Sequence, residues 1–108
     1  MSDELAGLTI AELAPRLRDR ELSPVEVAEA SVRRMEATEP NLNAFITRTG
    51  DQALAAARAA EAEILAGNYR GPLHGIPFVT KDLFWTKGVR TTSGSQADLG
   101  FVPQDDAG

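Results

Sequence analysis

One lysine stands where a strand gives way to a loop. Lys81 follows the apolar run 78–80, whose β-branched and aromatic residues are typical of a strand buried in a sheet. In α/β folds, sites form where strands end. Strand side chains alternate, so Asp82 is expected to point away and leave the Lys81 ammonium without a close carboxylate. A lysine with a buried stem and no such partner has a lowered pKa, and its neutral amine can take a proton from a hydroxyl. The alternative is a lysine that reaches water or pairs with a distant acid.

Three other side chains carry reactive groups. His74 is the only imidazole of the chain and lies in a loop. As a general base it needs a nucleophile and an orienting acid nearby, so a hydrogen-bonded structural role is favoured. Ser93 and Ser95 flank Gly94 without an identified base beside them. Hydroxyls in a turn are the better interpretation of that pair.

The common signatures of hydrolases and nucleotide-binding proteins are absent from the sequence. It contains no G-x-S-x-G, no G-x-x-x-x-G-K-[ST] and no G-x-G-x-x-G. Without Cys and with one His, a thiolate cluster, a multi-histidine metal site and a disulfide framework are excluded. No metal or other cofactor is therefore expected.

Two capping boxes predict the first helices. Thr9 and Glu12 have the T-x-x-E spacing, so a helix is expected to start there. Pro15 predicts a kink in it, or a short first turn followed by a helix over residues 15–20. Ser23 and Glu26 repeat the box with Pro at the first helical position, which predicts a helix over residues 24–37. The apolar positions expected on its core face are Val25, Ala28, Val32 and Met35.

A strand, a helix and a second strand are expected after Pro40. Residues 42–47 are β-leaning, and residues 51–66 predict an Ala-rich helix that is closed by Gly67 in the left-handed conformation. Thr49 with Gln52 offers an alternative start for that helix. With residues 78–80 as the second strand, the order indicates a βαβ unit and parallel strands.

Length and charge narrow the class of protein. The chain has 108 residues, 11 basic and 16 acidic, and a net charge of −5. Many of its apolar residues are Ala, which leaves few large apolar side chains to build the core of an independent domain. Residues 1–66 carry 12 acids and 7 bases, a balance that does not attract nucleic acid. No signal peptide and no apolar run of about 20 residues is present. We expect a cytoplasmic protein without direct nucleic-acid or membrane contact, and an assembly of identical chains is left open.

Two segments around Lys81 resemble the amidase signature family. Residues 71–83 read GPLHGIPFVTKDL and residues 86–95 read TKGVRTTSGS. Upstream, residues 8–10, 23–26 and 41–45 also resemble the opening part of that family. The resemblance covers essentially the whole chain, whereas family members are much longer.

The resemblance implies an α/β domain with a mixed sheet between helices and a Ser–Ser–Lys triad in which Lys81 matches the lysine. In the family this lysine relays protons through a bridging serine to a nucleophilic serine. The nucleophile attacks an amide carbonyl, and water hydrolyses the acyl-enzyme. Both serines belong to a Gly- and Ser-rich segment further along the chain, whose backbone N–H groups form the oxyanion hole. A small-molecule amide substrate is implied.

This sequence contains only the lysine of that triad, because the Ser-Gly-Ser at residues 93–95 lies in the wrong place to supply the serines. The resemblance therefore predicts that residues 1–108 are the N-terminal fragment of a single amidase domain. Residues 1–70 are expected to be mainly helical, and residues 71–108 to be loop, strand and loop carrying the lysine. The 108-residue chain alone is not expected to hydrolyse amides.

Two alternatives remain open. One branch of the family is the amidase subunit of the glutamine-dependent tRNA amidotransferase, which releases ammonia from glutamine and works with other subunits. That branch usually has Asn after Lys-Asp, whereas this sequence has Leu83 and the bulky pair Phe84 and Trp85. A general amidase is therefore preferred. The other alternative is a small helical interaction module without catalysis, which requires the chain to fold cooperatively alone.

Overall fold

The computed structural model describes residues 2–79, 81–82 and 84–107, in two units. Residues 1–42 with 50–77 form the first unit, and residues 43–49 with 78–108 form the second. Among the described residues, the first unit holds the three α-helices, and the second is mostly irregular. Thr80, from the expected second strand, and Leu83, used to choose between branches of the family, lie outside the described residues.

The first unit opens with the 3-10 helix η1 (Ser2–Gly7) and the helix α1 (Ile10–Arg18). The capping box predicted at the start of α1 is present in full. The Glu12 N–H donates to the Thr9 hydroxyl at 3.2 Å, and the Thr9 N–H donates to the Glu12 carboxylate at 2.9 Å. The helix continues across Pro15 to Arg18, so the predicted separate helix over residues 15–20 is wrong. Pro15 has no N–H, so it removes one backbone hydrogen bond without ending the helix.

Helix α2 spans Pro24–Leu42 and starts where the sequence predicts. The Val25 N–H donates to the Ser23 hydroxyl at 3.0 Å, and the Ser23 N–H donates to the Glu26 carboxylate at 3.1 Å. The Ser23 hydroxyl also donates to the carboxylate of Glu61 on the third helix. The start of α2 is therefore fixed both by its own first turn and by a neighbouring helix.

The end of α2 differs from the prediction. The helix runs five residues past residue 37, and Pro40 lies in its last turn, where the missing N–H removes one hydrogen bond without ending the helix at once. Asn43 follows the helix with a φ of +47°, the left-handed conformation common just after a helix. Since Leu42 ends α2 and residues 43–49 contain no strand, the strand predicted over residues 42–47 is wrong.

Helix α3 spans Gly50–Leu65, one residue earlier at each end than predicted, so Asp51 lies in its first turn. The start favours Thr49 over Asp51 as the residue before the helix. At the other end Gly67 has a φ of +89°, as predicted. The Gly67 N–H donates to the Ile64 carbonyl, and the next N–H reaches the Glu63 carbonyl at 2.9 Å, which is a Schellman motif.

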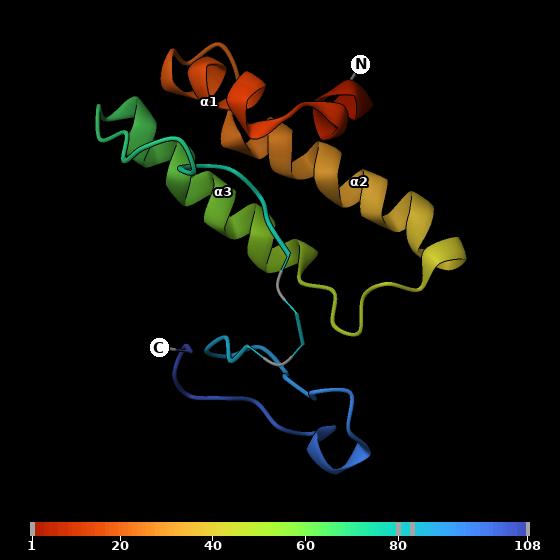
Figure 1. Ribbon diagram of the computed structural model, residues 1–108. Coiled ribbons are helices and arrows are strands. Elements are labelled where there is room, and N and C mark those ends of the chain that lie inside the picture. Colours follow the sequence, from red (N-terminus) through yellow and green to blue (C-terminus); the bar gives the residue numbers. More distant parts are fainter. Residues whose placement is uncertain (1, 80, 83, 108) are drawn as a thin grey trace. The chain divides into compact units, whose positions relative to one another are not determined.

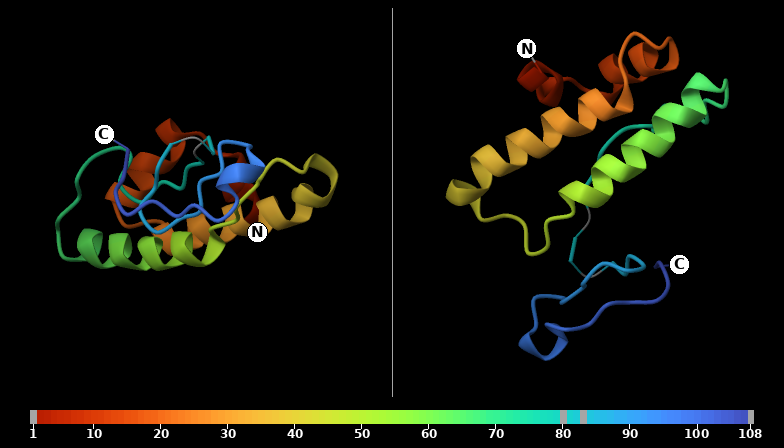
Figure 2. Two further views of the ribbon diagram at one scale, coloured as in Figure 1. Left: turned by 90° about the horizontal axis from the view of Figure 1, so that it is seen from below. Right: turned by 180° about the vertical axis from the view of Figure 1, so that it is seen from behind.

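Helices α2 and α3 run side by side in opposite directions (Figure 1), and the opposite view agrees (Figure 2). The apolar core of this unit is formed by Leu13, Leu17 and Val27, with Leu8, Leu22 and Ile76 packed against it. Of the core face predicted for α2, Ala28 is buried and the other three positions are half-buried. Val27 and Ala30 are buried in addition, because α2 contacts both η1 and α3 and so needs a wider apolar face.

The second unit is held mainly by hydrogen bonds between loops. The Thr91 N–H donates to the Phe101 carbonyl at 3.0 Å, and the Ala107 N–H donates to the Trp85 carbonyl at 2.8 Å. The rings of Trp85 and Phe101 meet edge to face with centroids 5.4 Å apart. The regular structure is a bridge between Thr86 and Val89 and the short 3-10 helix η2 (Gln96–Asp98).

The described residues contain no β-strand. Phe78 and Val79 are 83% and 71% exposed and belong to no strand, so the predicted buried strand is not found in its two described residues. A strand requires a neighbour for its backbone hydrogen bonds, and these residues have none within the described chain. The α/β class with a mixed sheet thus stays a prediction. Over the same described residues, no helix is both long and apolar enough to cross a bilayer.

Candidate functional site

Lys81 lies in the second unit and is exposed. The buried stem expected for it is not found, because the strand that would bury it is not formed. Its backbone carbonyl accepts a hydrogen bond from the Phe84 N–H at 3.1 Å. Within the described residues, no ion pair joins its ammonium to a carboxylate. The side chain is therefore accessible to a reaction partner.

Asp82, the next residue, is bound to Thr92. The Thr92 N–H donates to Oδ1 of Asp82 at 3.1 Å, and the Thr92 hydroxyl donates to Oδ2. These two bonds, the hydroxyl bond first, hold the pKa of Asp82 below its usual range. The sequence predicted that Asp82 would not neutralise Lys81, and the structure agrees with the result but not with the reason. Hydrogen bonds to Thr92, rather than strand alternation, direct this carboxylate.

The two serines beside Gly94 serve the local backbone. The Ser93 N–H donates to the Asp82 carbonyl at 2.7 Å, and Ser93 has a φ of +55°. The Ser95 hydroxyl accepts a hydrogen bond from the Ala97 N–H at 3.2 Å, which caps η2. These contacts fit the turn role predicted for both residues.

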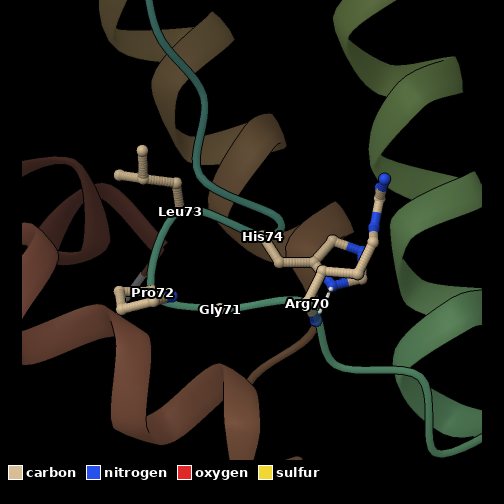
Figure 3. A pocket seen from close by; sticks show the side chains of 5 residues that line it. All are labelled: Arg70, Gly71, Pro72, Leu73 and His74. Carbon is tan, nitrogen blue, oxygen red and sulfur yellow. Dashed lines mark hydrogen bonds between the residues drawn. The ribbon is translucent and has the colours of Figure 1, made fainter.

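His74 belongs to the first unit, and its ring is buried. The Arg70 N–H donates to Nδ1 at 3.0 Å, so the neutral ring carries its proton on Nε2. Nε2 lies 3.3 Å from Oε1 of Glu63, which also pairs with the Arg70 guanidinium at 3.1 Å. In Figure 3 the His74 ring lies beside Arg70, and Leu73 points away from both. Both ring nitrogens thus have protein partners, as the structural interpretation of His74 predicts.

Residues 70–74 line a pocket on this unit (Figure 3), and Lys81 is not among the residues that form it. The loop continues into Gly75, which has a φ of +86° and lies close to Pro24. A Cβ atom there would lie 2.9 Å from Cγ of Pro24, so only glycine allows this approach to the start of α2. Gly75 therefore allows the loop that follows His74 to lie against the start of α2.

A metal site is not formed by the residues that the structure describes: no group of three or more His, Cys, Asp or Glu side chains is suitably placed.

The bond between Asp82 and Thr92 is not indicated by any pattern in the sequence. These residues are ten positions apart in irregular chain, and no periodicity links them. The sequence offers only one hint of this bond: a carboxylate at Asp82 and two hydroxyl side chains at Thr91 and Thr92 lie on either side of a segment rich in turns.

The chain is similar to known proteins over most of its length. The family model described as Amidase matches residues 26–108. A Geobacter metallireducens protein, named as a subunit of glutamyl-tRNA(Gln) amidotransferase, is 52% identical over 103 residues, which cover 95% of this chain and 21% of that protein. The protein of the same name from Methylococcus capsulatus is 52% identical over 99 residues, covering 92% of this chain and 20% of the relative.

A similar solved structure is described as a vestigial protein complex that reveals the evolutionary origins of an s-triazine catabolic enzyme. It has a TM-score of 0.85 and 29% sequence identity, and the match covers 92% of this chain and 22% of the solved chain. This chain therefore spans about a fifth of the length of the curated relatives it matches.

Proposed function

This chain belongs to the amidase family, and on that premise we propose that Lys81 is the proton relay of an enzyme that hydrolyses a carboxamide C–N bond. Residues 1–108 then form the N-terminal segment of a longer amidase domain. Two serines from a later Gly- and Ser-rich segment complete the triad, and the mixed sheet of the fold is completed there as well.

The proposed reaction requires a lysine that can lose and regain a proton. The neutral Lys81 amine accepts a proton from the bridging serine, which in turn takes one from the nucleophilic serine. The nucleophile attacks the carbonyl carbon, the C–N bond breaks, and the departing nitrogen receives a proton. Water then attacks the acyl-enzyme and releases the carboxylate. This role is supported by the match of Lys81 to the lysine of the family motif, and the neighbouring Asp82 carboxylate is bound to Thr92.

The test replaces Lys81 in the full-length protein that contains this segment. We expect Lys81→Ala to abolish amide turnover while the far-ultraviolet circular dichroism stays unchanged. Lys81→Arg is expected to fail as well, because a guanidinium does not release its proton near neutral pH. Lys87→Ala is the matched control, since Lys87 is the only other lysine of this segment and is also exposed. Turnover by Lys81→Ala at the rate of the control variant contradicts the proposal.

A second candidate is the amidase subunit of a glutamine-dependent tRNA amidotransferase. The relatives named as subunits of glutamyl-tRNA(Gln) amidotransferase, at 52% identity, favour it over a general amidase. The contrary sequence argument rests only on the identities of Leu83, Phe84 and Trp85. Under this candidate, other subunits would carry the tRNA contact, which suits the acidic balance of residues 1–66.

Substrate assays separate the two candidates. A general amidase hydrolyses simple carboxamides such as acetamide or benzamide without other components. The amidotransferase candidate predicts ammonia release from glutamine and amidation of glutamyl-tRNA(Gln) when the other subunits are supplied. An enzyme that hydrolyses simple amides but neither releases ammonia from glutamine nor amidates glutamyl-tRNA(Gln) contradicts the second candidate. The non-catalytic helical module remains the least favoured alternative, because the matched family is one of enzymes.

A further inference from the structure

The carboxylate of Asp82 follows directly after Lys81 in the chain, and its position matters for that lysine. A carboxylate within a few ångströms of an ammonium favours the protonated form. A proton relay needs the neutral form for part of its cycle. A free Asp82 side chain on the adjacent residue would therefore work against the proposed role of Lys81.

Thr92 occupies both oxygens of that carboxylate. Its N–H binds Oδ1 at 3.1 Å, and its hydroxyl binds Oδ2. The hydroxyl oxygen also accepts a hydrogen bond from the Gly94 N–H at 3.1 Å, which orients its proton toward Asp82. Thr92 is only 2% exposed, so this arrangement is built into the unit rather than lying loosely on its surface.

The backbone beside Lys81 is fixed by the same segment. The Ser93 N–H donates to the Asp82 carbonyl at 2.7 Å, so residue 82 is attached to residues 92–93 through both its side chain and its main chain. Arg90 is the charged group that acts on Asp82 from this segment, and its positive charge also favours the ionised carboxyl. At neutral pH the carboxylate is thus charged, bound and directed to Thr92.

We propose that Thr92 is a positioning residue for Lys81, because it holds the Asp82 carboxylate away from the Lys81 amine and anchors the main chain that carries the lysine. This inference rests on the proposed function of Lys81. Thr92 itself touches no reacting atom. It acts through Asp82.

The experiment compares Thr92→Val with Thr91→Val in the full-length enzyme. Both threonines are buried and both substitutions keep the side-chain shape, but the Thr91 hydroxyl donates to the Val89 carbonyl instead of to Asp82. We expect Thr92→Val to lower kcat by about ten- to a hundredfold, the size expected for one lost hydrogen bond to a charged group. KM should change little, and the acidic limb of the pH–rate profile should move to higher pH. Thr91→Val should match the parent enzyme, and Thr92→Ser, which keeps the hydroxyl, should retain most activity.

A double variant tests the electrostatic cause. In Asp82→Asn with Thr92→Val the released side chain has no charge, so the acidic limb should return to its position in the parent enzyme. A limb that stays displaced, or a Thr92→Val variant that behaves like Thr91→Val, overturns the inference. If Thr92→Val does not fold, Thr92→Ala, which removes the same hydroxyl, takes its place: the inference expects the same upward shift of the acidic limb, and a limb at the parent position overturns it.

The Lys81→Ala variant keeps the two proposals apart. If it retains turnover, the proposed function fails, and the positioning role of Thr92 falls with it. If Lys81→Ala is inactive but Thr92→Val is normal in rate and pH profile, only the inference about Thr92 fails.

Discussion

Nε2 of His74 lies 3.3 Å from Oε1 of Glu63, so the loop after α3 is bound back to the helix it has just left. The same oxygen accepts from the Arg70 guanidinium, and the other ring nitrogen accepts from the Arg70 backbone. The imidazole is thereby a structural link between the last turn of α3 and the loop that lines the pocket.

This link predicts unequal effects of two substitutions. His74→Ala removes the acceptor of the Arg70 N–H and leaves space around a buried ring, so we expect the free energy of unfolding to fall by about 1–3 kcal/mol. Glu63→Gln keeps an acceptor for Nε2 and loses only an exposed ion pair, for which less than about 1 kcal/mol is expected. Urea denaturation of both variants measures the difference. Equal losses would show that the charge of Glu63, and not the ring, stabilises the loop.

Gly75 lies close to Pro24, so replacing it with alanine should destabilise the fold by more than its positive φ alone would cause. In Gly75→Ala the new Cβ meets the proline ring at 2.9 Å and also requires a positive φ, so we expect a loss of about 2–3 kcal/mol. Gly67→Ala is the matched control, because Gly67 has nearly the same φ and no atom within 4 Å of the added Cβ. It should lose only about 1 kcal/mol. Thermal unfolding monitored by circular dichroism gives both values, and similar losses contradict the steric argument.

The lowered pKa of Asp82 predicts how the second unit responds to acid. Because the folded pKa lies below the unfolded value of about 3.9, the stabilisation is fully present above that value. It is lost as the pH falls through the folded pKa. Carbon-detected NMR titration of the Asp82 carboxyl should show a midpoint below the usual range, and Thr92→Val should move it upward. The carboxyl should titrate as in the parent protein when Thr91→Val is measured instead.

The capping box at the start of α1 predicts a local effect. Thr9→Ala removes the acceptor of the Glu12 N–H and should cost about 1 kcal/mol. Thr38→Ala is the control inside α2, where the hydroxyl donates to the Arg34 carbonyl and caps nothing. Because Ala is the better helix former, that change should be neutral or slightly stabilising. Chemical denaturation of the two variants decides, and an equal loss would remove the special role of Thr9.

The parts of the fold that the sequence predicts correctly depend on neighbouring residues. The starts of α1 and α2 follow from hydrogen bonds that span three residues, and the close of α3 follows from Gly67. The two predicted strands depend on partners far along the chain, and residues 43–49 and 78–79 have no strand partner among the residues described. Pro40 indicates a helix stop in the sequence, although one missing N–H near the end of a long helix is tolerated.

The same distinction between local and distant contacts holds for the candidate site. Lys81 stands out by its place after an apolar run and by the family motif, whereas its burial depends on a strand that the described residues do not form. The partner of Asp82 escapes prediction because Thr92 is brought to it by irregular chain, and a hydrogen bond of that kind has no period. The structural role of His74 is predicted correctly because a lone imidazole in a loop is most often bound by its neighbours.

Ser23 has a consequence for the order in which the chain folds. Its oxygen accepts from the Val25 N–H as soon as the first turn of α2 forms, but its proton reaches Glu61 only after the intervening chain has brought α3 back. The Ser23 hydroxyl thus stabilises both the first turn of α2 and the contact between α2 and α3. Nucleation of α2 and docking of α3 are coupled at this atom, so the antiparallel helix pair should assemble in one cooperative step.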